Sequence, residues 1–169
     1  TAFVYARDGA VQHIIGSGVG GGTMLGLASR LISIHNFNLF KQLAEAGDLS
    51  HIDLSIGDIS RIEIPGLSSD TTASNFGKIS DSASTEDIAL GIVNLVFQSV
   101  GTNAVLAARL NGVREIIFTG NLTQIEAGKR VLAGFSELYD MNITVPEHAE
   151  FATATGAALS NVPAGDLTD

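Results

Sequence analysis

Apolar and polar positions alternate at the start of the chain and then change to a helical period. Residues 3–6 and 11–15 are rich in β-branched and aromatic side chains, which favours two strands. The Asp8-Gly9 pair between them is typical of a tight hairpin turn. Residues 24–34 are apolar on most sides, as in a buried helix. The pattern therefore predicts a hairpin followed by a helix.

The next segments continue the helical period and then lose it. Residues 37–46 predict a second helix, with Asn36 or Asn38 as its cap and Gly47 as its end. Residues 52–59 place apolar side chains at alternate positions, which fits either a strand or a short irregular piece. The sequence therefore does not decide between a strand and an irregular piece for this segment.

The longest apolar pattern lies in the middle of the chain. Ser84 or Thr85 is a good cap, acidic residues follow in the first turn, and helical spacing then continues to about Asn111-Gly112. Strands are predicted at residues 114–119 and 142–145, helices at 123–139 and 151–159, and a tail from 161 to 169. This order predicts an α/β domain with a mixed sheet flanked by helices.

Composition narrows the class of protein. The 169 residues suffice for one well-buried domain, and 45% of them are hydrophobic, so the chain is globular. Cysteine is absent, which excludes a disulfide framework and thiol catalysis. The formal net charge is −9 without a basic patch, so we expect no nucleic-acid partner. Polar residues interrupt the apolar stretch 88–110, so we expect no membrane span, and a cytoplasmic location follows as the default.

Residues 16–27 hold six glycines between the predicted hairpin and the first helix. Glycine lets a ligand approach the backbone closely and permits positive φ, and amides at a helix N-terminus attract anions. The loop therefore fits a nucleotide phosphate or a nucleotide sugar. A flexible turn, or close packing of the helix on a strand, explains the same glycines.

The order of several motifs around this loop resembles type II pantothenate kinases. The resemblance starts with the residues before the loop and then follows the chain in order through segments 1–5, 16–27, 41–48, 52–59, 72–77, 116–121, 147–151 and 156–157. That family belongs to the sugar kinase, actin and Hsp70-like superfamily, whose members have two similar domains with ATP between them. The resemblance implies that residues 1–160 are the C-terminal, actin-like or ribonuclease H-like domain of such a kinase. Nothing in the chain resembles the N-terminal domain.

The resemblance also implies which residues bind ATP. These are the glycine loop, an aromatic side chain beside the adenine, and the turn after a buried strand: Gly18, Val19, Gly20, Gly21, Gly22, Phe40, Gly120 and Asn121. Phe37 and Phe40 also fit a core stripe at helical spacing, and the turn at Gly120 also fits an ordinary strand-to-helix connection. Mg²⁺ is implied with ATP. No metal ligand or catalytic residue is assigned, because the family places its catalytic base and its first phosphate loop in the other domain.

The expected function is transfer of a phosphate from ATP to pantothenate, the first step of coenzyme A biosynthesis, with this chain alone inactive. Coenzyme A or acyl-coenzyme A is a possible feedback ligand. Another kinase or ATPase of the superfamily, such as an acetylhexosamine kinase, and a nucleotide- or coenzyme A-sensing module without catalysis are the alternatives. We also expect a homodimer, with Leu90, Val93 and Phe97 facing the second subunit, unless the chain buries these side chains itself.

Other polar residues give no chemical signal of their own. Asp53 and Asp58 suggest surface or capping groups, and the four histidines show neither zinc spacing nor a triad order. The roles of residues 72–77 and of Glu147 stay open.

Overall fold

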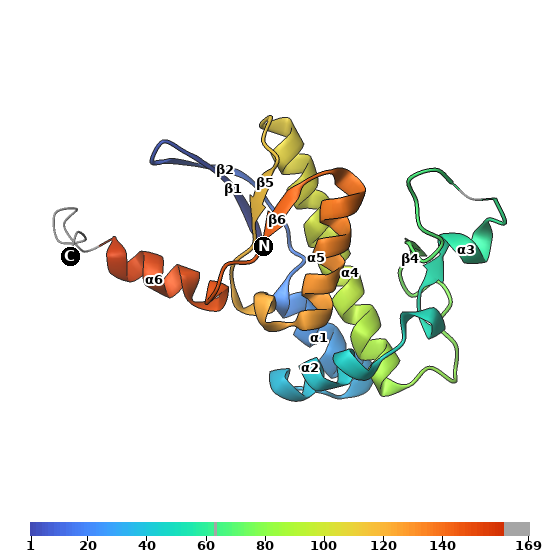
Figure 1. Ribbon diagram of the computed structural model, residues 1–169. Helices are drawn as coiled ribbons and strands as arrows, with labels where there is room; N and C mark the ends of the chain where they lie inside the picture. Colours follow the sequence, from blue (N-terminus) through green and yellow to red (C-terminus); the bar gives the residue numbers. More distant parts are fainter. Residues whose placement is uncertain (63, 161–169) are drawn as a thin grey trace.

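One long helix organises the fold (Figure 1). The computed structural model describes residues 1–62 and 64–160, and its helix α4 (Thr85–Leu110) runs through the centre. The Ser84 hydroxyl accepts the Asp87 amide, so the predicted cap at Ser84 is confirmed. By length and composition α4 resembles a membrane span, yet 61% of its most apolar window is buried inside the fold. A core helix covered on several sides has the same composition.

Three further helices pack on α4. They are α1 (Gly21–Ile32), α2 (Phe37–Ala46) and α5 (Glu126–Tyr139). The predicted cap at Asn36 is confirmed, since its side chain accepts the Leu39 amide at 2.9 Å. The core between these helices consists of Met24, Ala28, Phe40, Ala44, Ala89, Ile92, Val93, Val96, Phe97, Val100, Leu132 and Phe135, joined by side chains from the flanking strands and turns.

The strands form three separate pairs rather than the single mixed sheet that the sequence predicted. The ladders join β1 (Ala2–Arg7) with β2 (Ala10–Gly16), β3 (Leu54–Ser55) with β4 (Thr72–Ser74), and β5 (Glu115–Ile117) with β6 (Asn142–Thr144). The first two are antiparallel and the third is parallel. The coarser expectation of an α/β fold is confirmed.

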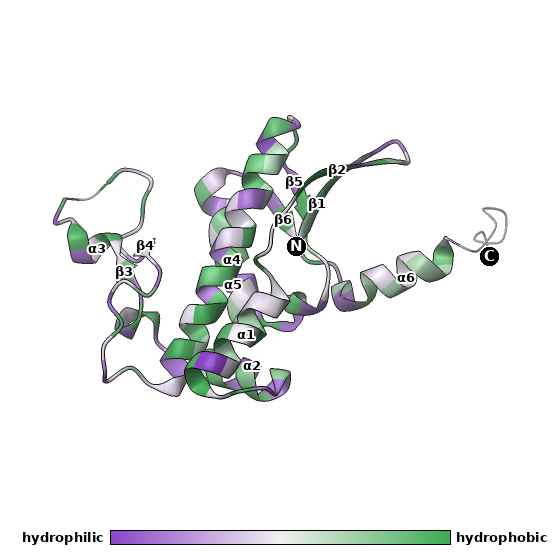
Figure 2. Ribbon diagram, turned by 180° about the vertical axis from the view of Figure 1, so that it is seen from behind, coloured by the Kyte–Doolittle hydropathy of each residue, from purple (hydrophilic) through white to green (hydrophobic). Residues whose placement is uncertain are grey.

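The hairpin explains part of this difference. Asp8 and Gly9 both have positive φ, as the predicted turn requires. A register shift between Phe3 and Val4 bends β1, and Phe3 is the one hairpin side chain buried in the core. The hairpin therefore leaves the body of the molecule instead of joining β5. The β3–β4 pair lies on the other flank of α4 (Figures 1 and 2).

The remaining elements are short. They are η1 (Leu49–His51), α3 (Ile56–Ile59), η2 (Asn121–Gln124), η3 (Ala149–Phe151) and α6 (Ala152–Leu159). The segment 52–59 is thus a two-residue strand followed by one helical turn. The first helix begins at Gly21 rather than residue 24, so the last glycines of the loop form its first turn. The predicted tail, residues 161–169, lies outside the described residues.

The stripe predicted to face a second subunit belongs largely to the core of the chain. Val93 is fully buried and Phe97 is 4% exposed, because α1, α2 and α5 cover these sides of α4. Val93 and Phe97 were therefore wrongly assigned to a dimer interface. The dimer itself stays a prediction.

A buried carboxylate joins the start of α4 to the end of α2. The Asp87 carboxylate accepts the amides of Asp48 and Ser84 at 2.8 and 3.1 Å, and the His51 ring lies 3.1 Å away. Burial raises the pKa of Asp87, but these hydrogen bonds and that of the Ser84 hydroxyl outweigh it, and the pKa falls to about 2. Asp87 is thus more acidic in the folded chain than in the unfolded chain.

Gly128→Ala should destabilise the chain by about 1–3 kcal/mol, because the new Cβ would overlap the buried ring of Phe97. Gly134→Ala is the matched control: it lies in the same helix, and a Cβ there meets nothing within 4 Å. We expect the control to be neutral or to stabilise by up to about 1 kcal/mol. Urea denaturation followed by circular dichroism measures both, and equal effects would contradict the packing described here.

Asp87→Asn should remove part of the acid sensitivity of the fold. A lowered folded pKa adds stability that is complete above the unfolded pKa of about 4, and that is lost as the pH falls toward about 2. At pH 7 we expect the variant to lose about 2 kcal/mol, and between pH 4 and 2 to lose less than the unchanged chain. Asp81→Asn, an exposed loop residue, is the control. If the free energy of unfolding had the same pH dependence in Asp87→Asn and in the unchanged chain, the lowered pKa assigned to Asp87 would be wrong.

Candidate functional site

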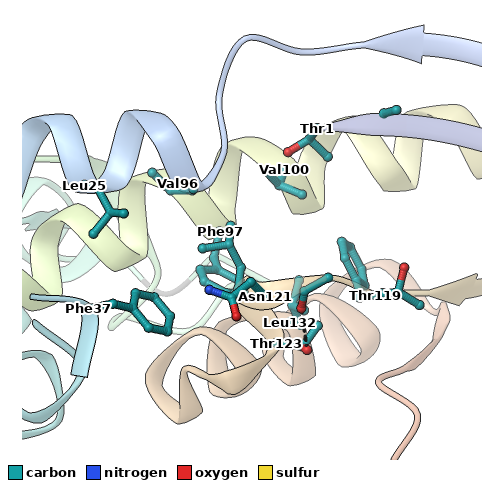
Figure 3. Close-up of a pocket in the computed structure, with 15 residues that line it drawn as sticks. Thr1, Leu25, Phe37, Val96, Phe97, Val100, Thr119, Asn121, Thr123 and Leu132 are labelled. Atoms are coloured by element: carbon teal, nitrogen blue, oxygen red, sulfur yellow. Dashed lines mark hydrogen bonds between the residues drawn. The ribbon is translucent and has the colours of Figure 1, made fainter. Parts of the chain in front are cut away.

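A cleft of about 320 Å³ opens between the start of α1 and the turn after β5 (Figure 3). Its floor is apolar and comes largely from Val96, Phe97 and Val100 of α4. The complete lining is Thr1, Ala2, Gly21, Leu25, Phe37, Val96, Phe97, Val100, Phe118, Thr119, Gly120, Asn121, Leu122, Thr123 and Leu132. Polar groups lie mainly on its two walls.

The first wall begins with the glycine loop, which connects β2 to α1. Side-chain hydroxyls hold the loop: Thr23 donates to the Gly18 carbonyl at 2.9 Å, and Thr1 donates to the Val19 carbonyl at 2.8 Å. A Cβ at Gly20 would lie 2.9 Å from the Thr1 hydroxyl oxygen, so the absence of a side chain permits this contact. The loop glycines do not use positive φ, contrary to the sequence expectation.

The amides at the start of α1 are free to bind an acceptor. Those of Gly21, Gly22 and Thr23 have no hydrogen-bond partner in the part of the chain that the structure describes. The Met24 amide is the first to bond back, to the Gly20 carbonyl at 3.0 Å. Free amides at the positive end of a helix dipole favour an anion at this wall.

The second wall is the turn between β5 and η2. Gly120 has φ +104° and ψ 174°, a conformation that is essentially restricted to glycine. Its amide donates to the Ala149 carbonyl at 2.8 Å, and its carbonyl accepts the Thr123 hydroxyl at 2.7 Å. These bonds fix the turn and leave the Asn121 side chain exposed at the cleft, where it accepts from Gln124.

The structure brings together some of the residues that the sequence predicted to bind the nucleotide. Gly21, Gly120 and Asn121 line the cleft, whereas the other loop residues, Gly18, Val19, Gly20 and Gly22, belong to the segment beside it. Phe40 is fully buried and does not line the cleft, because its side of α2 faces α4. Of the two phenylalanines on α2, Phe37 is the one that lines the cleft.

Phe37 is the functional candidate that sequence reasoning passed over in favour of Phe40. It lies three residues earlier, is half-buried, and points along the wall of the cleft (Figure 3). The Lys41 ammonium lies 5.5 Å from the centre of its ring, within the range of a cation–π contact. Helical spacing identified both rings, but a single helix does not show which side its neighbours cover.

Asp53 explains the segment 72–77, to which the sequence gave no role. Its buried carboxylate accepts the Phe76 amide at 2.8 Å and the side-chain amide of Asn94, on α4, at 2.6 Å. Thr72 and Asn75 also donate to it. Asp53 thus holds the segment 72–77 on α4, away from the cleft, and its role is structural.

The other polar residues that the sequence singled out also have local partners. Asp58 forms a capping box with Ser55 and pairs with Lys78 at 2.6 Å. The histidines do not meet, and Glu147 is exposed beside His148. Within residues 1–62 and 64–160, no three acidic or histidine side chains lie close enough to hold a metal ion.

Gly120→Ala should destabilise the chain by about 1–3 kcal/mol, since alanine is strained at this φ. Gly22→Ala provides the comparison: it lies on the opposite side of the cleft, in the first turn of α1, and its Cβ meets nothing within 4 Å. We expect no loss of stability for Gly22→Ala in thermal unfolding. A neutral Gly120→Ala would show that the turn has another conformation.

Comparison with known proteins places these features in a family. The family model described as Fumble matches residues 4–160. "Pantothenate kinase 1" of Oryza sativa subsp. japonica is 38% identical over 120 residues, which are 67% of this chain and 18% of that protein. "Type II pantothenate kinase" of Oceanobacillus iheyensis is 30% identical over 153 residues, which are 89% of this chain and 58% of that protein. "Type II pantothenate kinase" of Staphylococcus haemolyticus is 28% identical over 166 residues, which are 91% of this chain and 60% of that protein.

The chain therefore spans between about a fifth and three fifths of the length of these relatives. The family match covers both walls of the cleft and the helix beneath it. The resemblance to type II pantothenate kinases is confirmed, and the chain belongs to the Fumble family.

Proposed function

We propose that this chain is the nucleotide-binding part of a pantothenate kinase, with an actin-like arrangement of its domain. The observation that carries the proposal is the cleft, which Gly21 at the start of α1, the Gly120 turn and Phe37 line together. The names of the family relatives, pantothenate kinases, suggest the class of reaction. For the full-length protein we propose that ATP and pantothenate give ADP and 4′-phosphopantothenate.

The cleft offers different chemistry at its different parts. The amide of Gly21 at the cleft, with those of Gly22 and Thr23 beside it, suits phosphate oxygens, because the helix dipole adds positive potential where the chain as a whole carries a net charge of −9. The apolar floor and the Phe37 ring suit a flat heterocycle, and Asn121 offers a polar group that can both donate and accept. A nucleoside triphosphate matches this combination.

The transfer itself needs groups beyond this cleft. The γ-phosphoryl group would pass to the hydroxyl of pantothenate, which must give its proton to a base. We assign that base, and the first phosphate loop, to another part of the full-length kinase. Because the described residues hold no carboxylate cluster for Mg²⁺, we propose that the ion arrives with the nucleotide, and we derive no step from it. Homodimerisation, feedback by coenzyme A or acyl-coenzyme A, and a cytoplasmic location stay predictions.

Two other functions would use the same cleft differently. A sensor without catalysis would bind nucleotide or coenzyme A, and its full-length protein would phosphorylate nothing. A kinase for another acceptor, such as an acetylhexosamine, would consume ATP without pantothenate. Radiolabelled ATP with each acceptor, added to the full-length protein, separates the three. Transfer to pantothenate alone supports the proposal, and transfer to the hexosamine alone, or to neither, overturns it.

Calorimetric titration of the 169-residue chain with ATP should show weak, saturable binding. A separate assay of the same chain with ATP and pantothenate should show no phosphorylation of pantothenate. Phe37→Ala should weaken this binding by about 3- to 10-fold, because it removes an aromatic wall of the cleft. Leu39→Ala is the control, since Leu39 lies on the same helix, is 43% exposed and does not line the cleft. Absence of saturable binding, or equal effects of the two variants, would count against the nucleotide assignment.

A further inference from the structure

Helix α5 begins without a cap of its own. The residue before it, Ile125, is fully buried and has no side-chain acceptor for the first amides of the helix. The acceptor comes from a different helix: the Glu45 carboxylate of α2 accepts the Ala127 amide at 2.6 Å. A residue 82 positions earlier in the chain thus takes the place of the missing cap.

The second oxygen of the same carboxylate is also used. Glu45 Oε2 lies 2.9 Å from the guanidinium of Arg130, which is on the first turns of α5. Among the described residues, these two contacts are the hydrogen bond and ion pair that link α2 to α5. Glu45 therefore holds the beginning of α5 at two points, as a bridging carboxylate can.

The two linked elements both border the cleft. On α2, Phe37, Lys41 and Glu45 are spaced four residues apart and share one side of the helix. On the other side of the link, the turn with Gly120 and Asn121 leads directly into α5 through η2. Figure 3 shows Phe37 of α2 and Asn121 of the turn among the side chains that line the cleft.

We propose that Glu45 is a positioning residue that sets the spacing between Phe37 and the Gly120–Thr123 turn. Without its carboxylate, the Ala127 amide lacks an acceptor, the first turn of α5 frays, and the turn before it moves relative to α2. The effect on nucleotide affinity rests on the proposed function, whereas the spacing itself is a property of the unliganded chain.

Four variants separate this role from general stability. Glu45→Ala removes both contacts, Glu45→Gln keeps an oxygen for the Ala127 amide, and Arg130→Ala keeps the cap but removes the ion pair. Ser84→Ala is the matched control. It removes the cap at the start of α4, and no residue near Ser84 lines the cleft. Glu45→Asp, one methylene shorter, replaces Glu45→Ala if that variant does not fold.

Hydrogen exchange by mass spectrometry on the unliganded chain is the first measurement. Glu45→Ala should speed exchange both in residues 118–130 and in 36–46, with the middle of α4 unchanged. Glu45→Gln should stay near the unchanged chain, and Ser84→Ala should speed exchange only around residues 84–90. A change in Glu45→Ala that is confined to the first turn of α5 would make Glu45 a cap alone and overturn the proposal.

Titration with ATP is the second measurement. Glu45→Ala should weaken binding by about 3- to 10-fold, while Glu45→Gln, Arg130→Ala and Ser84→Ala stay within about twofold of the unchanged chain. Equal losses for Glu45→Ala and Ser84→Ala would assign the effect to stability and overturn the positioning role. If the unchanged chain binds no ATP, the proposed function fails, and hydrogen exchange still decides whether Glu45 sets the spacing between Phe37 and the Gly120–Thr123 turn.

Discussion

Close approach to α4 is the constraint on which the other elements depend. α2 ends where Gly47 touches the Glu86 backbone, a contact that leaves no room for a Cβ. At Gly91, a Cβ would lie 2.6 Å from Ile52 Cγ2, so the segment after η1 also crosses α4 at a glycine. Gly91 lies inside α4, where a glycine costs about 1 kcal/mol relative to alanine, so burial at this crossing must offset that cost. α4 is thus weaker as an isolated helix and better suited as a shared core.

Polar attachment to this helix framework relies on carboxylates that accept N–H groups. Asp87 joins α4 to the end of α2, Asp53 joins the β3–β4 segment to α4, and Glu45 joins α2 to α5. Each uses donors from another element, so a chain with a net charge of −9 needs few cations to satisfy its acids. At Asp87 this choice makes the attachment of α4 to the end of α2 sensitive to acid, because the hydrogen bonds that lower its pKa are made by the ionised carboxylate.

Local signals in the sequence predicted the elements better than their assembly. The helix from Ser84 and the turn at Asp8-Gly9 were predictable, because caps and turn residues act over a few positions. The separate strand pairs were not, since a bulge after Phe3 and the position of α4 decide which edges meet. Periodicity also placed Phe37 and Phe40 on α2 without distinguishing the ring that faces α4 from the ring that lines the cleft.

The cleft has no element of its own, and its shape is set by the core. Phe97 shows this directly, because one part of its ring packs against Gly128 of α5 and another part lines the cleft floor. A floor made of core side chains is close-packed from below and cannot shift without moving α4 or α5. The walls, in contrast, are a helix start and a turn that hydrogen bonds hold in place. Adaptation to a bound nucleotide should therefore fall on the walls, where the first amides of α1 are free and the Asn121 side chain is exposed, while the floor keeps the shape that the helices impose.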